Sequence, residues 1–267
     1  MEILGKDYLL VTLDFETFFA PKYTLTAMNT FTYVAHELFS IHGVGIKIED
    51  QKAKWFRDTE EALDYIDTRA DGKPVAMVCH NTYFDGWILH KHFDWHPALY
   101  IDTMGMSRGL FPTHSASLEK LAERLWPDNN KMRKGKELVN FKGVTTEALW
   151  ANPAMEQTMA RYCIQDCDLT YAAFMRMEPF YPDSELLLID MTLGMMCHPM
   201  LRVDVQRVIE CEQLAVIERD NTIAASGLSE TVLGSNKQFC QWMEAQGIEV
   251  PMKDSPTVKV KDADGNP

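Results

Sequence analysis

The sequence lacks any apolar run long enough to cross a membrane. No segment approaches the ~18 consecutive apolar residues that a membrane-spanning helix needs. The apolar start at 8–13 is short and is ended by Asp14, so it is not typical of a signal peptide. We therefore expect a cytoplasmic protein with no membrane partner.

Paired cysteines and basic charge are also scarce. The six cysteines form no CxxC pair, which predicts reduced and mostly buried thiols. The formal net charge is −13, with 39 acidic against 26 basic residues, which is unusual for a protein that binds nucleic acid. Metal ions held by acidic side chains would offset part of this charge. A zinc site is a minor alternative, drawn from Cys163, Cys167, Cys197 and His198.

The sequence does contain an alternation of strand and helix patterns. Apolar, β-branched runs predict strands, and amphipathic spacing predicts helices. This alternation predicts an α/β fold with a mixed sheet flanked by helices. The polar stretch 127–143 is rich in lysine and glycine and predicts a loop. The predicted strands are 8–15, two runs within 38–49, 75–79 and 99–103, and the predicted helices are 59–70, 82–92, 115–126 and 154–176.

Pro179 and Pro182 interrupt this alternation. They favour a division into an α/β domain at 1–180 and a helical segment at 181–267. The polar end of the chain has no closing element, so we expect the chain to stop inside a longer protein. The helices expected in the second segment are near 185–196, 203–224 and 235–246.

Asp14 and Glu16 lie two residues apart at the end of the first predicted strand, so both point to the same face. Leu13 and Phe15 then point into the core. Two carboxylates ~4 Å apart repel by about 4 kcal/mol at an effective dielectric of ~20. Either one is protonated or a cation lies between them, and a divalent cation satisfies the pair best. Two solvated acids at a strand end are the plain alternative.

Two further acids belong to helix patterns. Asp85 lies about one turn into a helix that Asn81 is expected to cap, just after a predicted strand. Functional sites of α/β folds gather at such strand ends. Tyr162 and Asp166 are four residues apart and share one face of the long helix. Asp168 lies about 200° further round and is expected to face solvent.

Three short motifs built from these residues resemble, in the same sequence order, the three exonuclease motifs of the DEDD superfamily. That superfamily has the DnaQ-like, or ribonuclease H-like, fold. The motif tyrosine is typical of the DEDDy subgroup, because the histidine subgroup would carry histidine where this chain has Arg161. Single motifs of this kind are weak, but three in order are specific. The motifs are Asp14-x-Glu16, Asn81-x-x-Phe84-Asp85 and Tyr162-x-x-x-Asp166.

Other segments resemble the proofreading domain of bacteriophage-type family A DNA polymerases. The resemblance implies a 3′–5′ exonuclease that edits DNA during replication, in the host cytoplasm if the chain is phage-encoded. Its substrate would be a single-stranded or frayed DNA 3′ end, and its product nucleotide monophosphates. By this resemblance, segment 181–267 would begin the thumb-side region of the polymerase domain. The polymerase active site would be absent from this chain, and the missing polymerase domain would be its partner. These segments are 101–104, 117–122, 135–138, 185–190 and 234–239.

The resemblance also implies a mechanism, two-metal phosphodiester hydrolysis with Mg²⁺ or Mn²⁺. Asp14, Glu16 and Asp166 would hold the first ion. Asp14 would share the second, which Asp85 would hold through water. Tyr162 would orient the attacking water or the scissile phosphate.

Contacts to the nucleic acid are also implied by the resemblance. It places Thr17 and Phe18 beside the terminal nucleotide, and Asn81 and Phe84 are candidates for the same cleft. Aromatic stacking suits sequence-independent binding of a single strand, although core packing is the plain alternative for the phenylalanines. The basic stretch 131–142 would contact the phosphate backbone or remain a solvated loop.

Two other functions fit the same motifs. One is a DEDDy ribonuclease that trims RNA 3′ ends, because the same acids hydrolyse either polymer and nothing in the sequence shows how the 2′-OH is treated. The other is a non-catalytic exonuclease fold that serves as a docking module. The presence of all four acids together with Tyr162 favours a catalytic protein.

Overall fold

The computed structural model describes residues 1–129 and 132–250. The chain divides into two compact units, 1–200 and 201–267. Among the described helices, none is both long and apolar enough to span a membrane. The polar end of the chain and Lys131 of the basic stretch lie outside the described residues.

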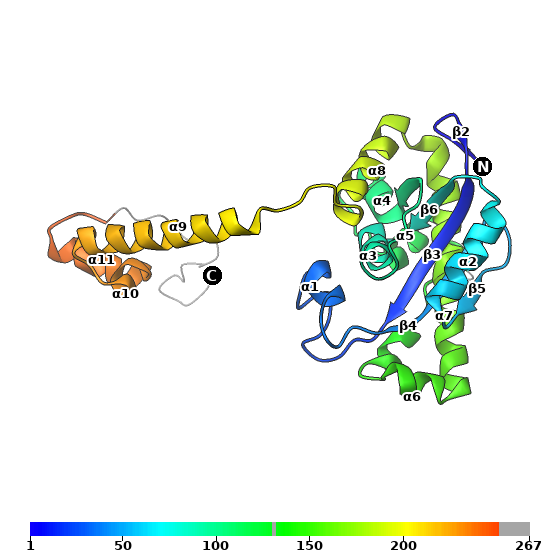
Figure 1. The fold of residues 1–267 in the computed structure, drawn as a ribbon, viewed down its shortest axis with the longest axis horizontal. Helices are drawn as coiled ribbons and strands as arrows, with labels where there is room; N and C mark the ends of the chain where they lie inside the picture. The colour runs from blue at the N-terminus through cyan, green and yellow to red at the C-terminus, as the bar shows by residue number, and fades with distance from the viewer. Residues whose placement is uncertain (130–131, 251–267) are drawn as a thin grey trace, which may run out of the picture. The chain divides into compact units, whose positions relative to one another are not determined.

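A mixed five-stranded sheet forms the centre of the first unit (Figure 1). Its strands are β3 (Leu9–Thr17), β4 (Ile41–Ile48), β5 (Lys54–Phe56), β6 (Val75–Cys79) and β7 (Leu99–Asp102). The strand order is β5-β4-β3-β6-β7. Central β3 is antiparallel to β4 and parallel to β6, β7 is parallel to β6, and β5 is antiparallel to β4. The predicted α/β fold with a mixed sheet is confirmed. A small hairpin of β1 (Glu2–Ile3) and β2 (Lys6–Asp7) precedes the sheet.

Helices cover both faces of this sheet. Successive side chains of β3 point to opposite faces, and each face carries apolar side chains that have to be buried. Leu13 and Phe15 are buried on one face, which packs against α1 (Thr30–Val34), α2 (Thr59–Ala70), α3 (Thr82–Ile88) and the π-helical turn η1 (Leu89–Phe93). Leu10 is buried on the other face, which packs against α4 (Thr103–Leu110), α5 (Leu118–Leu125) and α7 (Pro153–Met177). The remaining short elements of this unit are η2 (Glu137–Phe141), α6 (Thr146–Trp150) and η3 (Glu178–Phe180).

Helix α8 (Asp183–Cys197) covers the sheet edge at β7. Leu186 and Leu193 are buried, and Asp190 Oδ1 accepts a hydrogen bond of 2.7 Å from the backbone N–H of Tyr100 in that edge strand. This contact satisfies a donor that an edge strand would otherwise leave unpaired. The compact unit therefore continues to Met200, while the division of function at 180/181 stays a prediction.

The second unit is helical over its described part. It contains α9 (Val205–Ser226) and α11 (Asn236–Ala245), as the sequence pattern predicts, and the short α10 (Glu230–Leu233), which the pattern did not predict. Gly227 ends α9 in the left-handed conformation, with φ 68°. Ser229 and Ser235 cap the two helices that follow, each through its side-chain oxygen.

Gly45 sets how closely α7 lies on the sheet. A Cβ atom at this position would meet the Sγ atoms of both Cys163 and Cys167 at 2.7 Å. We expect Gly45→Ala to lower the free energy of unfolding by about 1–3 kcal/mol, because α7 has to move away from β4.

Urea unfolding measures this effect, and Gly194→Ala in α8 is the matched control. A Cβ at Gly194 meets nothing within 4 Å, so alanine there stabilises by up to about 1 kcal/mol. Unfolding of Gly45→Ala at the same urea concentration as the parent protein would contradict the close packing.

Candidate active site

Asp14 and Glu16 lie on the face of β3 that α7 covers. In the register with β4, Asp14 is opposite Gly45 and Glu16 is opposite Gly43, so no β4 side chain fills the space beside the acids. Glu16 is buried, and Asp14 is partly exposed. One ligand atom each from Asp14, Glu16 and Cys163 of α7 lie within 4.8 Å of one another. The structure thus places the two acids side by side, as strand periodicity predicts.

Asp85 is brought to the same strand end by α3. It lies in the first turn of that helix, and 2% of its surface is exposed. Its Oδ1 accepts a hydrogen bond of 3.0 Å from the backbone N–H of Phe15, the residue between Asp14 and Glu16. This bond joins the start of α3 directly to the acidic end of β3.

The turn into α3 is held by Asp102, which lies in the segment 101–104 of the family resemblance but had no predicted role. Asn81 occupies the N-cap position, but its backbone is left-handed (φ 79°, ψ 51°) and its side chain makes no capping hydrogen bond. The expected side-chain cap by Asn81 is therefore wrong. Asp102 Oδ1 instead accepts the N–H groups of Asn81 at 2.8 Å and Thr82 at 3.3 Å. This role depends on β7 lying beside β6, which no local pattern in the sequence reveals.

Helix α7 brings Tyr162 and Asp166 to the acids on β3. Both side chains are buried, and each residue is 3% exposed. Asp168 points elsewhere, as helical spacing predicts, because its Oδ1 accepts a hydrogen bond of 2.9 Å from Lys47 Nζ and its side chain is 51% exposed. On the inner side of the helix, Cys163 Sγ donates to the backbone carbonyl of Asp14 at 3.3 Å.

A cation lies among these acids. The Nζ atom of Lys134 forms an ion pair with Asp166 Oδ2 and lies 4.6 Å from the centre of the Tyr162 ring. Its loop is tied to α7, because the Gln165 side chain donates a hydrogen bond to the carbonyl of Arg133. Lys134 belongs to the basic stretch expected to contact phosphate or solvent, and its place beside Asp166 was not anticipated.

Burial dominates the electrostatics of this cluster. It raises the pKa of Asp14 and raises the pKa values of Glu16 and Asp85 well above those of ordinary carboxyl groups. The Asp14 carboxylate adds to the rise in the other two, while the Lys134 ammonium lowers the pKa of Asp14 and Glu16. Asp166 Oδ1 is buried with no hydrogen-bond partner among the described residues. A divalent cation with oxygen ligands would relieve this concentration of carboxyl groups.

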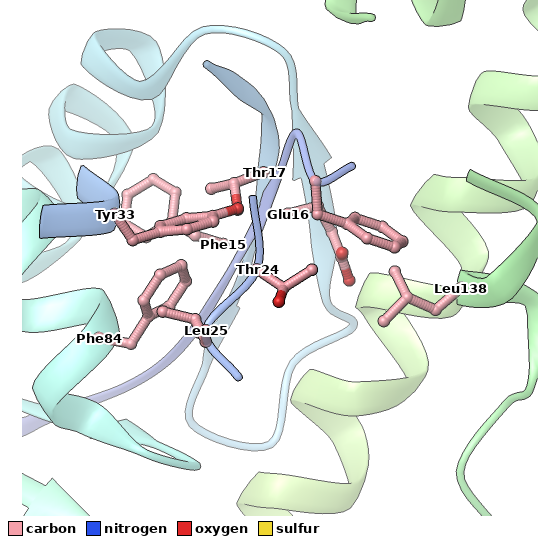
Figure 2. Close-up of a pocket in the computed structure, with 9 residues that line it drawn as sticks. Phe15, Glu16, Thr17, Thr24, Leu25, Tyr33, Phe84 and Leu138 are labelled. Carbon is pink, nitrogen blue, oxygen red and sulfur yellow. The ribbon is translucent and has the colours of Figure 1, made fainter. Parts of the chain in front are cut away.

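A pocket of about 240 Å³ lies beside Glu16 (Figure 2). Figure 2 shows Tyr33, Leu25 and Phe84 on one side of it and Leu138 on the other. Leu138 belongs to η2, whose segment is joined to the chain after β3 by a hydrogen bond from the Gly143 N–H to the Phe19 carbonyl at 2.8 Å. The pocket is lined by Phe15, Glu16, Thr17, Phe19, Thr24, Leu25, Tyr33, Phe84 and Leu138.

Two of the four residues expected to bind substrate line this pocket, namely Thr17 and Phe84. Phe18 does not line it and packs beside Tyr23, with ring centres 6.0 Å apart. Asn81 does not line it either. Their contact with substrate stays a prediction, and Phe19 is the phenylalanine that reaches the pocket.

The cysteines considered for a zinc site do not come together. Cys163 and Cys167 pack against Gly45, whereas Cys197 packs against Gly86. In the described ranges, no group of neighbouring metal-ligating atoms combines these thiols.

Buried carboxylates from β3, α3 and α7 that converge beside a pocket define a candidate metal-dependent hydrolase. A profile of the 3′–5′ exonuclease family matches residues 38–180, more than half of the 267-residue chain. The chain therefore belongs to the 3′–5′ exonuclease family, whose members act on nucleic acid 3′ ends, and its DEDD-type members use divalent metal ions. The match contains Asp85, Tyr162 and Asp166 and begins after Asp14 and Glu16.

Solved structures give weaker similarities. A nuclease in its apo form has 15% identity and a TM-score of 0.47, covering 71% of this chain and 81% of that one. NrnC from Brucella melitensis has 15% identity and a TM-score of 0.45, with coverages of 73% and 85%. Escherichia coli RNase D, an exoribonuclease involved in structured RNA processing, has 12% identity and a TM-score of 0.43, with coverages of 70% and 45%. No curated protein matches the chain by sequence.

Proposed function

We propose that this chain removes nucleotides from the 3′ end of a DNA strand, as the proofreading part of a bacteriophage-type family A DNA polymerase. The observation that carries the proposal is the convergence of four acids and a tyrosine from three separate elements beside a mostly apolar pocket. The residues assigned to catalysis are Asp14, Glu16, Asp85, Tyr162 and Asp166.

The donor set of the cluster suits divalent metal ions. Carboxylate oxygens are the ligands that Mg²⁺ and Mn²⁺ prefer, and Asp166 carries a buried oxygen without a partner among the residues described. Asp14, Glu16 and Asp166 would hold one ion, and Asp14 would share a second with Asp85. When bound, such ions acidify a water molecule and neutralise charge on the phosphate.

Tyr162 supplies a hydrogen-bond donor to this site. Burial, followed by the nearby Glu16 and Asp14 carboxylates, raises the pKa of its phenol. The hydroxyl therefore keeps its proton at neutral pH and can donate a hydrogen bond to a phosphate oxygen or orient a water molecule.

The pocket beside Glu16 suits the terminal nucleotide. Its aromatic side chains offer surfaces on which any base can stack. Its two threonine hydroxyls are already paired, Thr17 with the hydroxyl of Tyr33 at 2.9 Å and Thr24 with that of Thr26 at 2.8 Å. The other polar side chain that lines the pocket is Glu16, which is assigned to the metal ion, so few polar groups are left to recognise a ribose 2′-OH, which favours deoxyribose.

The polymerase context is supported by the sequence resemblance of 185–190 and 234–239 to the entry of the polymerase region. The first of these segments lies in α8, where Asp190 is bonded to the sheet edge, and the second includes the start of α11. The resemblance predicts helices in the segment that follows the exonuclease sheet, and α8 and α11 lie in that segment.

The test is parallel digestion of 5′-labelled DNA and RNA strands of matched sequence, with Mg²⁺ or Mn²⁺ present. We expect progressive shortening from the 3′ end and a rate on DNA about 10–10²-fold above that on RNA, since a pocket without 2′-OH partners discriminates only modestly. A DNA duplex with a mismatched 3′ end should be degraded faster than a paired one, because editing acts on frayed ends.

Faster digestion of RNA would replace this proposal with a ribonuclease that trims RNA 3′ ends. Absence of degradation together with absence of Mn²⁺ binding by calorimetry would identify a non-catalytic docking module.

A further inference from the structure

Half of the eight histidines gather away from the carboxylate cluster, around the end of η1 and the end of α8. His90 and His92 belong to η1, His96 follows it, and His198 follows α8. His92 is directed elsewhere, because its Nε2 lies 3.3 Å from the carbonyl of Val34 and its ring stacks on another aromatic ring. The other three rings lie against one another.

Two imidazole nitrogens and a carboxylate converge in this group. His90 Nδ1 and His96 Nε2 are 2.9 Å apart. One ligand atom each from His90, Asp94 and His96 lie within 4.8 Å of one another. Two neutral imidazole nitrogens this close form one N–H···N hydrogen bond, in which one ring donates and the other accepts. Both nitrogens therefore point to the space between the two rings. Two Zn–N bonds of about 2.0–2.1 Å at a tetrahedral angle need the nitrogens only about 3.3 Å apart.

The backbone holds these groups in place. Leu89 is fully buried and anchors the start of η1 in the core. Asp94 ends the turn in the left-handed conformation (φ 48°), and its N–H donates to the His90 carbonyl at 3.2 Å. Trp95 N–H then donates to the Leu89 carbonyl at 3.3 Å. π-helical turns of this kind are rare and are often found at functional sites.

The charges around the group suit a metal cation. Burial, followed by the His198 ring, lowers the pKa of both His90 and His96, so both are neutral ligands at physiological pH. Lys91 also lowers the pKa of His90, while Asp94 raises the pKa of both rings. The His198 ring stacks on His96 with ring centres 3.9 Å apart and an interplanar angle of 21°. The nitrogen lone pairs of His198 lie in the plane of its ring. Because that ring is stacked on His96, His198 covers one side of the group and is not counted as a ligand.

We propose that His90, Asp94 and His96 form a binding site for a divalent transition-metal ion of the zinc class, separate from the carboxylate cluster. Imidazole nitrogens select Zn²⁺, Co²⁺ or Ni²⁺ over Mg²⁺, which keeps to oxygen ligands. Two imidazoles and one carboxylate leave one tetrahedral position for water. The bound ion would take the place of the proton shared by His90 and His96, which would move to the other nitrogen of its own imidazole ring, and the ion would tie the residues after η1 to η1 itself.

Zinc binding to the full chain tests the proposal, with excess Mg²⁺ present to occupy the carboxylate cluster. We expect one Zn²⁺ per chain by equilibrium dialysis, and His96→Ala and His90→Ala each weaken its binding by at least about tenfold. His114→Ala is the matched control, because His114 is exposed and its ring nitrogen pairs only locally, with Thr113 at 3.1 Å. It should bind Zn²⁺ as the parent protein does, as should Asp14→Asn.

A second measurement does not depend on how the variants fold. Titration of the parent protein with Zn²⁺ should shift the imidazole ¹⁵N signals of His90 and His96 and leave that of His114 unchanged. The proposal is wrong if these signals do not move. It is also wrong if Zn²⁺ binding is lost in Asp14→Asn and kept in His96→Ala, because the ion would then be in the carboxylate cluster.

Discussion

Asp166→Asn is expected to lower the rate of 3′-end degradation by about 10³-fold, while Asp168→Asn leaves it within about twofold. A loss of this size corresponds to about 4 kcal/mol of transition-state stabilisation, which is the order of what a metal-held charge contributes. Asparagine keeps the shape of the side chain and removes only the charge.

The two positions differ in surroundings, although they lie two residues apart in α7. Asp166 is buried against the acidic end of β3 and pairs with Lys134. Asp168 is on another side of the helix, where it pairs with Lys47 at a half-exposed position. The Asp168 carboxylate is half-exposed, and Lys47 Nζ keeps a hydrogen bond to the Gln51 carbonyl at 2.7 Å, so Asp168→Asn tests the same chemical change without touching the site.

Single-turnover digestion of a 5′-labelled strand measures both rates at matched Mg²⁺ concentration. Circular dichroism and thermal unfolding of the two variants check that each keeps its fold. Equal rates for Asp166→Asn and Asp168→Asn would remove Asp166 from the active site and with it the proposed metal cluster.

Much of this site is predictable because it obeys local periodicity. A strand period of two places Asp14 and Glu16 on one face, and a helical spacing of four places Tyr162 and Asp166 on another. The same helical geometry separates Asp168 from them. The mixed sheet is predictable for the same reason, since alternating strand and helix patterns indicate its order of elements.

The parts that escaped prediction depend on residues distant in sequence. Asp102 holds the turn before Asp85 only because β7 pairs with β6, and Lys134 reaches Asp166 from a polar loop without periodic pattern. The pocket illustrates a third cause. The β3–β4 register shifts between Glu16 and Thr17. Strand alternation is interrupted at that irregularity, so the pattern before it could not show which of the next phenylalanines reaches the pocket.

Lys134→Met is expected to destabilise the metal-free protein by about 2 kcal/mol and, by the same free energy, to strengthen Mn²⁺ binding by about thirtyfold. Losing one partner of a buried ion pair costs about 3–5 kcal/mol. The expected cost is smaller here, because the Lys134 side chain is 26% exposed and burial already raises the pKa of Glu16, so this neighbour can take up a proton.

Thermal unfolding and calorimetry measure the two effects, and Lys142→Met is the matched control. Lys142 is an exposed lysine that lies just after η2. A cost of about 2 kcal/mol lowers the melting temperature by about 4–8 °C in a unit of this size. The control variant should melt with the parent protein and bind Mn²⁺ with the same affinity.

The opposite signs of the two effects have one cause. The Lys134 ammonium neutralises part of the acidic cluster through Asp166, and a divalent ion held by Asp166 would have to displace it. Removing the ammonium raises the free energy of the metal-free state and leaves the metal-bound state nearly unchanged, so the stability difference should vanish at saturating Mn²⁺. Weaker Mn²⁺ binding in Lys134→Met would contradict this competition and would mean that the lysine supports the ion. If Lys134→Met instead binds Mn²⁺ more tightly but reacts more slowly, the Lys134 ammonium has a second role. It would pair with the substrate phosphate after it leaves the Asp166 carboxylate.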